Sequence, residues 1–395
     1  MINVGQAGRP LLTRYTMSEP ANDPPLVTRP EPEDAPPPPS PSLPKPGFLE
    51  AVLWCLVFVA VQMLGAILVI LVVFIAYVLA APEPGKFVDE QLAGFGNSMD
   101  RSKAEGERPP MPREFGQSLA WGMLAAQFAS LALILLVLPR RIGPDWKRQI
   151  GVCRPHWFHV VLVLLIVPGF MISAELIQQL FRQLTGMEPP AVKSLKGVFG
   201  QFPWPLTALA VAVGPGVVEE LWCRGFLGRG LCARYGIVAG VLTTSVLFAA
   251  MHMDPSLLCV IILMGAYLHF VYIVTRSIWP PILLHALNNG LGLFIDLAVN
   301  GGVIVLPNVV YIASFSLLLF GSVALWTSRA TLEPVTLKDE AWWESDGWKP
   351  ESPGISAPPT ETNVRIGYTV VSPVALISTV VSAGVLVYLA FRFAR

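Results

Sequence analysis

A series of apolar stretches, each long enough to cross a membrane as a helix, constrains the fold of this chain more than any other feature. The hydrocarbon core of a bilayer is about 30 Å thick, so a helix that spans it needs about 20 apolar residues. The sequence predicts nine such segments, at 48–80, 117–138, 157–181, 204–223, 236–252, 256–274, 279–298, 303–327 and 369–391. Charged residues make up only 14% of the chain, against about 25% in a soluble domain. We therefore expect an all-α, polytopic bundle of transmembrane helices, with eight core segments and an extra C-terminal one.

Polar stretches divide the chain into four parts. Residues 1–47 form a proline-rich tail, and such a segment buries too little apolar surface to fold. We expect it to be a disordered spacer, although a role as ligand for a proline-binding module stays open. The transmembrane bundle follows at 48–327 and includes a polar loop at 81–115. A polar linker at 328–368 then leads to a C-terminal transmembrane segment at 369–395.

The distribution of charge gives an orientation but no soluble partner. Lys+Arg and Asp+Glu are equal at 27 each, so net charge offers no argument for a nucleic-acid partner. If all nine segments span, the side that holds the N-terminal tail carries more Lys and Arg than the other side. The positive-inside rule then favours a cytoplasmic N-terminus. The five cysteines are scattered without a Cys-x-x-Cys pair, which argues against a disulfide framework or a zinc knuckle.

Three ionisable residues stand at the end of the fourth apolar segment: Glu219, Glu220 and Arg224. An ionisable residue at membrane depth costs at least ~2.5 kcal/mol, so three together need a reason. A helix end that surfaces among the headgroups would explain them, and so would a buried polar site. Glu220 and Arg224 are four residues apart and share one face of a helix, where such a pair is common.

Polar residues on two later segments supply partners for such a site. His252 lies four residues after Phe248, and Asn289 lies four residues after His285, so each pair shares one helix face. A single histidine in an apolar helix is more often a packing residue than a ligand. Polar groups inside a bundle must find one another, however, because lipid offers them no partner. The combination predicts one shared site.

The chemistry open to such a cluster is limited. A carboxylate and two imidazoles can activate a water, either as general base or by holding a metal that lowers the pKa of the water. An amide can donate to a developing oxyanion, and an arginine can hold a glutamate ionised. The sequence has no Gly-x-Ser-x-Gly elbow and no His-Glu-x-x-His motif. Water-mediated hydrolysis therefore fits better than covalent catalysis, and Cys223 is not expected to be a nucleophile.

These three motifs, Glu-Glu-x-x-x-Arg, Phe-x-x-x-His and His-x-x-x-Asn, occur in this order on separate predicted helices. Their arrangement resembles the CPBP family of intramembrane proteases. That family includes the type II CAAX prenyl endopeptidases and bacterial relatives such as the lysostaphin resistance protein A group. The resemblance covers the motif-bearing core, residues 204–298. It implies a multi-pass protein, which we expect in a bacterial cytoplasmic membrane.

The resemblance also implies an activity. The chain would be an intramembrane endopeptidase that hydrolyses a peptide bond of a membrane-associated or lipidated protein. Processing of a prenylated CAAX protein is one form that this activity could take. Glu219 would activate the hydrolytic water with help from His252, while Glu220 and Arg224 would support it.

Two further assignments follow from the same resemblance. His285 and Asn289 would coordinate a ligand or form the oxyanion site. The usual classification as a metalloprotease would place Zn²⁺ or another divalent metal on Glu219, His252 and His285, which matches a catalytic zinc ligand count. A metal-free mechanism that uses glutamate and histidine is also open at this point.

Several polar residues and two other classes of function stay open. Glu175 could line the cavity, or it could lie solvated near a helix end. His156 and His159 flank the third segment near its basic edge, which predicts an interfacial place, and His269 has no polar partner one turn away. A non-catalytic immunity or scaffold protein could bind a partner in the same cavity. A transporter would relay protons through these residues, but the sequence shows no convincing internal repeat.

Overall fold

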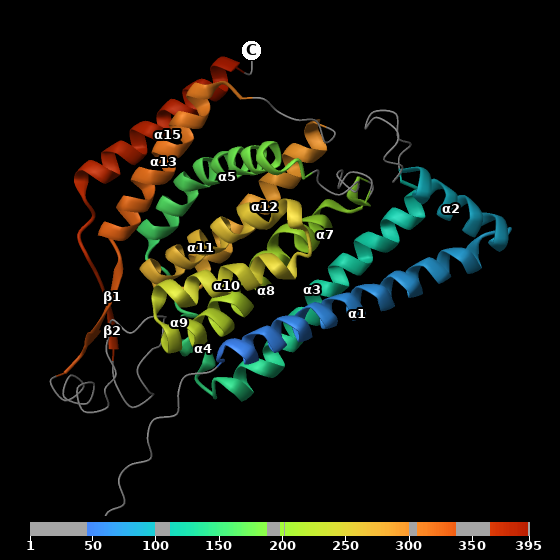
Figure 1. The fold of residues 1–395 in the computed structure, drawn as a ribbon, viewed down its shortest axis with the longest axis horizontal. Coiled ribbons are helices and arrows are strands. Elements are labelled where there is room, and N and C mark those ends of the chain that lie inside the picture. The colour runs from blue at the N-terminus through green and yellow to red at the C-terminus, as the bar shows by residue number, and fades with distance from the viewer. Residues whose placement is uncertain are drawn as a thin grey trace, which may run out of the picture. The chain divides into compact units, whose positions relative to one another are not determined.

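The computed structural model describes residues 46–98, 111–187, 198–200, 202–299, 306–336 and 364–393. The predicted tail, apart from its last two residues, and most of the predicted linker lie outside these ranges. Helices make up nearly all of the regular structure within them (Figure 1). The prediction of an all-α, polytopic bundle is confirmed.

Seven of the described helical stretches are long and apolar enough to cross a membrane. They are α1 (Phe48–Ala80), α3 (Arg113–Arg141), α5 (Trp157–Thr185), the stretches Trp204–Tyr235 and Pro255–Thr275, α13 (Asn308–Thr327), and Pro373–Arg392 of α15 (Pro373–Phe393). Two more helices fall on predicted segments: the shorter apolar α10 (Ile237–Met251) and α12 (Trp279–Val299), which has polar residues in its middle. These helices support an integral, multi-pass membrane protein. The cytoplasmic N-terminus and the bacterial membrane stay predictions.

The polar loop predicted at 81–115 contains a helix. α2 covers Pro84–Ser98 and packs against α1 and α3. Aromatic side chains explain this packing, since the rings of Phe95 in α2 and Phe115 in α3 lie with their centroids 4.5 Å apart. The expectation of a loop throughout this segment was therefore wrong. Apolar side chains spaced along one face of a polar helix hold it to its neighbours.

The described ends of the predicted linker pair as strands. β1 (Ala330–Pro334) and β2 (Val364–Tyr368) form an antiparallel pair in which Ala330 lies opposite Tyr368 (Figure 1). The pair joins the end of α13 to the start of α15, and these two helices also pack against each other. The last helix is therefore attached to the bundle through paired strands and direct helix contacts.

The fourth spanning stretch continues beyond its predicted end at residue 223. It consists of α7 (Trp204–Ala208), η2 (Leu209–Val213), α8 (Gly214–Glu220), η3 (Leu221–Gly228) and α9 (Arg229–Tyr235). The segments η2 and η3 are π-helical, a rare conformation that is frequently found at functional sites. The three charged residues thus lie in the middle of a spanning stretch.

A hydrophobic core forms where this stretch meets its neighbours. Trp222 is fully buried, and its ring lies 5.0 Å from that of Phe58 in α1 and 5.1 Å from that of Phe226. The stretch also packs closely on α12 at Gly216, where a Cβ would lie 3.0 Å from the Cβ of Ala286. Only a residue without a side chain permits this approach. Gly216 therefore brings the Glu-Glu motif beside the helix that carries the last motif.

Candidate active site

Glu220 and Arg224 form a buried ion pair. Arg224 Nη1 donates to Glu220 Oε1 over 2.8 Å, and the side chains of Arg224 and Glu220 are 1% and 0% exposed respectively. Arg224 Nη2 donates to the backbone carbonyl of Gly265 in α11 (Leu258–Thr275) over 2.8 Å. The two opposite charges compensate each other where a single charge would be costly. The alternative of a helix end among the headgroups does not hold for this pair.

His285 of α12 lies between the two glutamates. Its Nδ1 is 2.8 Å from Glu220 Oε1, and its Nε2 is 3.8 Å from Glu219 Oε2. An ionised carboxylate only accepts hydrogen bonds, so the imidazole Nδ1–H donates to Glu220. In the neutral ring, Nε2 keeps its lone pair and faces Glu219. Glu220, paired with Arg224, therefore fixes the tautomer and the orientation of His285.

Glu219 is the less constrained of the two acids. Its side chain is 15% exposed, and its Oε2 atom is buried without a hydrogen-bond partner among the described residues. The 3.8 Å between this oxygen and His285 Nε2 is too long for a direct hydrogen bond. A water could bind both atoms across that distance. Glu219 is therefore a carboxylate of the cluster with an oxygen that no described residue binds.

Phe248 of α10 joins the three motifs. It is 3% exposed, and the Arg224 guanidinium carbon lies 4.8 Å from the centroid of its ring. The rings of His252 and His285 meet it edge-on, with centroids 4.8 Å and 6.1 Å away. The aromatic face attracts the cation, and the ring edges exclude water from the ion pair. Phe248 thus contacts residues of all three motifs.

His252 lies farther out than the other motif residues. It caps the end of α10, where its side chain is exposed and its Nδ1 lies 2.9 Å from the Phe248 carbonyl oxygen. The carbonyl accepts, so Nδ1 carries the proton and Nε2 is the acceptor of the neutral ring. No hydrogen bond or ion pair joins His252 to either glutamate within the described parts of the chain. The ring of Phe248 contacts the rings of both His252 and His285.

Asn289 is held by the π-helical segment η2. Its Nδ2 donates to the Val211 carbonyl over 3.3 Å, and its Oδ1 accepts from Asn288 Nδ2 over 3.3 Å. An asparagine amide has two N–H donors, so one stays available after the bond to Val211. His285 and Asn289 share one face of α12, as predicted, but they contact different neighbours.

The predicted metal ligands do not form one group. Across the described ranges, which include all three predicted ligands, no set of three or more His, Cys, Asp or Glu side chains is arranged to hold a metal ion. Glu219 and His285 are adjacent, whereas His252 contacts the ring of Phe248 and forms no hydrogen bond or ion pair with either of them among the described residues. The observed donors therefore do not fit a three-ligand site, and Zn²⁺ or another divalent metal stays a prediction.

Two polar residues of α3 at the same helix interface were missed by sequence reasoning. Gln127 packs against Gly214, where a Cβ would lie 2.8 Å from the Gln127 Cγ. Gln127 Oε1 and the fully buried Ser130 Oγ have no hydrogen-bond partner among the described residues. Their i,i+3 spacing inside an apolar helix was the available signal. Both mark α3 as a further polar wall beside α8.

The remaining polar residues lie elsewhere. Glu175 accepts hydrogen bonds from Gln179 and Arg182 in an exposed cluster, which decides between its two predicted places. His269 is 1% exposed, and its Nε2 lies 3.7 Å from Cys232 Sγ. His159 lies near the start of α5, at the predicted edge of the segment, and it is fully buried there with its Nε2 2.7 Å from the Ser328 carbonyl oxygen at the end of α13.

Comparison with known proteins identifies the segment that holds this cluster. Residues 201–291 match the family model described as type II CAAX prenyl endopeptidase Rce1-like. No curated protein and no solved structure matches the chain. The match covers all three motifs, so the predicted resemblance to CPBP intramembrane proteases is confirmed over this segment.

Proposed function

We propose that this chain, whose residues 201–291 match that family of endopeptidases, hydrolyses a peptide bond of a membrane-associated or lipidated protein. One observation carries the proposal. The buried pair of Glu220 and Arg224 orients His285, so that its Nε2 faces an unpaired oxygen of Glu219 across 3.8 Å. One water can donate a hydrogen bond to each of these two acceptor atoms, Glu219 Oε2 and His285 Nε2, and can then transfer a proton.

Glu219 is the proposed general base. It takes a proton from the water, whose oxygen then attacks the carbonyl carbon of the scissile peptide bond. The C–N bond of the resulting tetrahedral intermediate breaks, and the proton passes from Glu219 to the leaving amine. His285 Nε2 orients the water by accepting its other hydrogen. A positioned base of this kind typically contributes about 10²–10⁴-fold to the rate.

Asn289 and His252 have supporting roles in this proposal. The second N–H of the Asn289 amide donates to the oxyanion of the intermediate, while the bond to Val211 holds the amide in place. The exposed His252 assists Glu219 once a substrate covers the site. We assign these steps to side chains of the chain itself. Of the three predicted metal ligands, Glu219 and His285 lie together, whereas His252 does not join them.

The substrate class follows from where the site lies. The carboxylates sit within a membrane-spanning stretch, so the scissile bond must reach membrane depth. A lipid-modified peptide is already bound to the bilayer and reaches that depth at low cost. A prenylated CAAX sequence is the candidate suggested by the name of the matching family.

Cleavage by the purified chain in proteoliposomes tests the proposal. The substrates would be a farnesylated peptide ending in a CAAX sequence, the same peptide without the lipid, and a palmitoylated peptide without CAAX. Mass spectrometry should show one new peptide end in at least one lipidated substrate. If the folded chain cleaves none of them while a characterised CAAX endopeptidase cleaves the farnesylated one, a non-catalytic binding role is favoured.

A further inference from the structure

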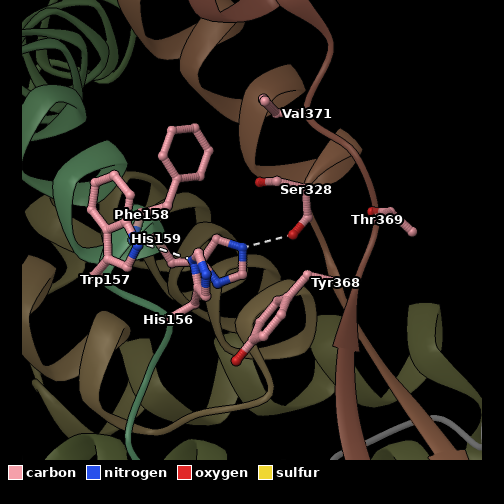
Figure 2. Close-up of a pocket in the computed structure, with 8 residues that line it drawn as sticks. All are labelled: His156, Trp157, Phe158, His159, Ser328, Tyr368, Thr369 and Val371. Atoms are coloured by element: carbon pink, nitrogen blue, oxygen red, sulfur yellow. Dashed lines mark hydrogen bonds between the residues drawn. The ribbon is translucent and has the colours of Figure 1, made fainter.

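A cavity lies outside the candidate active site. Its volume is about 220 Å³, several times the ~30 Å³ of one water in the liquid, so it accommodates one small ring. It lies at the start of α5, beside the end of α13 and the segment that leads from β2 into α15 (Figure 2). These three helices are candidate membrane spans, and all of them begin or end at this point. The cavity is therefore at the level of the lipid headgroups.

Two histidines present complementary hydrogen-bonding atoms in this cavity. His159 is fully buried, and its Nε2 lies 2.7 Å from the Ser328 carbonyl oxygen. The carbonyl must accept, so the neutral ring has a bare acceptor at Nδ1, and this atom is buried without a partner in the described parts of the chain. His156 Nδ1 accepts from the Phe158 N–H over 3.3 Å, so its Nε2 carries a hydrogen that can be donated.

A buried acceptor without a partner points to a ligand. An unpaired polar atom of this kind costs about 1–3 kcal/mol unless something binds it. The ring centroids of His156 and His159 are 5.9 Å apart, so one ligand can reach both. A hydroxyl group both donates and accepts, and it can satisfy His159 Nδ1 and His156 Nε2–H together.

The walls of the cavity are aromatic and uncharged. The ring of Tyr368 lies 4.4 Å from that of His156 and 5.7 Å from that of His159, and Trp157 lines the same cavity (Figure 2). Burial raises the pKa of Tyr368, so its phenol stays neutral. No Lys, Arg, Asp or Glu is among the lining residues. None of the lining residues would supply a counter-charge to a phosphate or a carboxylate, whereas a neutral ring with hydroxyl groups matches the walls.

We propose that this cavity binds the sugar ring of a neutral glycolipid. The ring hydroxyls pair with His156 and His159, and the apolar face of the sugar packs against Tyr368. The acyl chains then extend along the lipid-exposed side chains of α15, such as Val374 and Ile377. The bound lipid lies at the junction of α5, α13 and the paired strands, and it joins the C-terminal helix to the bundle.

Lipid retention in native mass spectrometry tests this site. The full chain would be purified in a detergent without a sugar headgroup and titrated with monogalactosyldiacylglycerol, phosphatidylcholine or phosphatidylglycerol. The wild type should retain the galactolipid in preference to the two phospholipids. The variants His156→Phe and Tyr368→Leu should each weaken its retention by about tenfold, the upper range for a lost hydrogen bond or aromatic contact. Trp204→Ala, at an exposed aromatic residue outside the cavity, should not.

Three results would overturn the proposal: equal retention of all three lipids, retention unchanged by both cavity variants, or an equal loss in the Trp204→Ala control. Free galactose separates the two sources of the same ring. Competition by free galactose would identify the ring alone as the ligand. If free galactose does not compete, the site binds the sugar only as the headgroup of a membrane lipid. Either result supports a sugar-binding site. Peptidase activity is not the readout, so this test is independent of the proposed function.

Discussion

Arg224→Met should destabilise the helical bundle by about 3–5 kcal/mol. Methionine keeps an unbranched chain in place of the aliphatic part of Arg224. It lacks the guanidinium cation that pairs with Glu220 at 2.8 Å. Glu220 is 0% exposed, so its carboxylate would be left buried without a counter-charge. Removing one partner of a buried ion pair typically costs this much, against a total stability of about 5–15 kcal/mol. The Gly265 carbonyl and the face of Phe248 also lose a partner.

Reversible unfolding in mixed micelles, followed by circular dichroism as dodecyl sulfate is added, would measure this cost. Arg182→Met is the matched control, since Arg182 pairs with Glu175 in an exposed position and should contribute about 1 kcal/mol or less. The double variant Glu220→Met/Arg224→Met should recover most of the stability, because it leaves no unpaired charge. Equal losses for Arg224→Met and Arg182→Met would refute the reasoning and show that Glu220 is solvated.

Three further changes test the geometry of the site. Gly216→Val should separate α8 from α12 and destabilise the bundle by about 1–3 kcal/mol in the same unfolding assay, whereas Gly292→Val, where a Cβ has open space, should cost less. Asn289→Ala should lower kcat by about 100-fold with little change in KM if its amide donates to the oxyanion, and an equal change in both constants would contradict that role. Dialysis against a chelator should leave cleavage unchanged if the chain's own groups suffice; loss of activity that added Zn²⁺ restores would instead support the predicted metal set.

Local helix geometry explains two side-chain contacts that the sequence spacing indicated. Residues four apart share a helix face, so the pairing of Glu220 with Arg224 and the contact between Phe248 and His252 follow from spacing alone. The cost of a charge in lipid explains why His285, on another helix, lies beside the glutamates. These arguments need no knowledge of the packing.

Features that depend on packing were not predictable. Spacing pairs Glu220 with Arg224, but it does not tell which glutamate also binds His285. The π-helical segment that presents the Val211 carbonyl to Asn289 has no recognised sequence signal. The contact of His159 with the Ser328 carbonyl depends on where α13 ends, which spacing along α5 does not show.

The two polar segments show the same limit. The sequence argument treated 81–115 and 328–368 as connections because of their charge and proline content. In the segment 81–115, the helix α2 is held in place by packing of Phe95 against Phe115 of α3, a contact between residues on different elements. Strands form at the ends of the second because they pair with each other. Partners distant along the chain decide both outcomes.

The cleavage rate of Glu219→Gln tests the central claim most directly. Glutamine has nearly the same shape as glutamate, so the fold and the position of the side chain beside His285 should be kept. Glutamine cannot take a proton from water. With the lipidated peptide that the wild type cleaves, the rate should fall at least about 100-fold, while Glu175→Gln, at an exposed carboxylate, should keep the wild-type rate. A Glu219→Gln rate within a few-fold of the wild type would show that Glu219 is not the base, and the account of the site would be wrong.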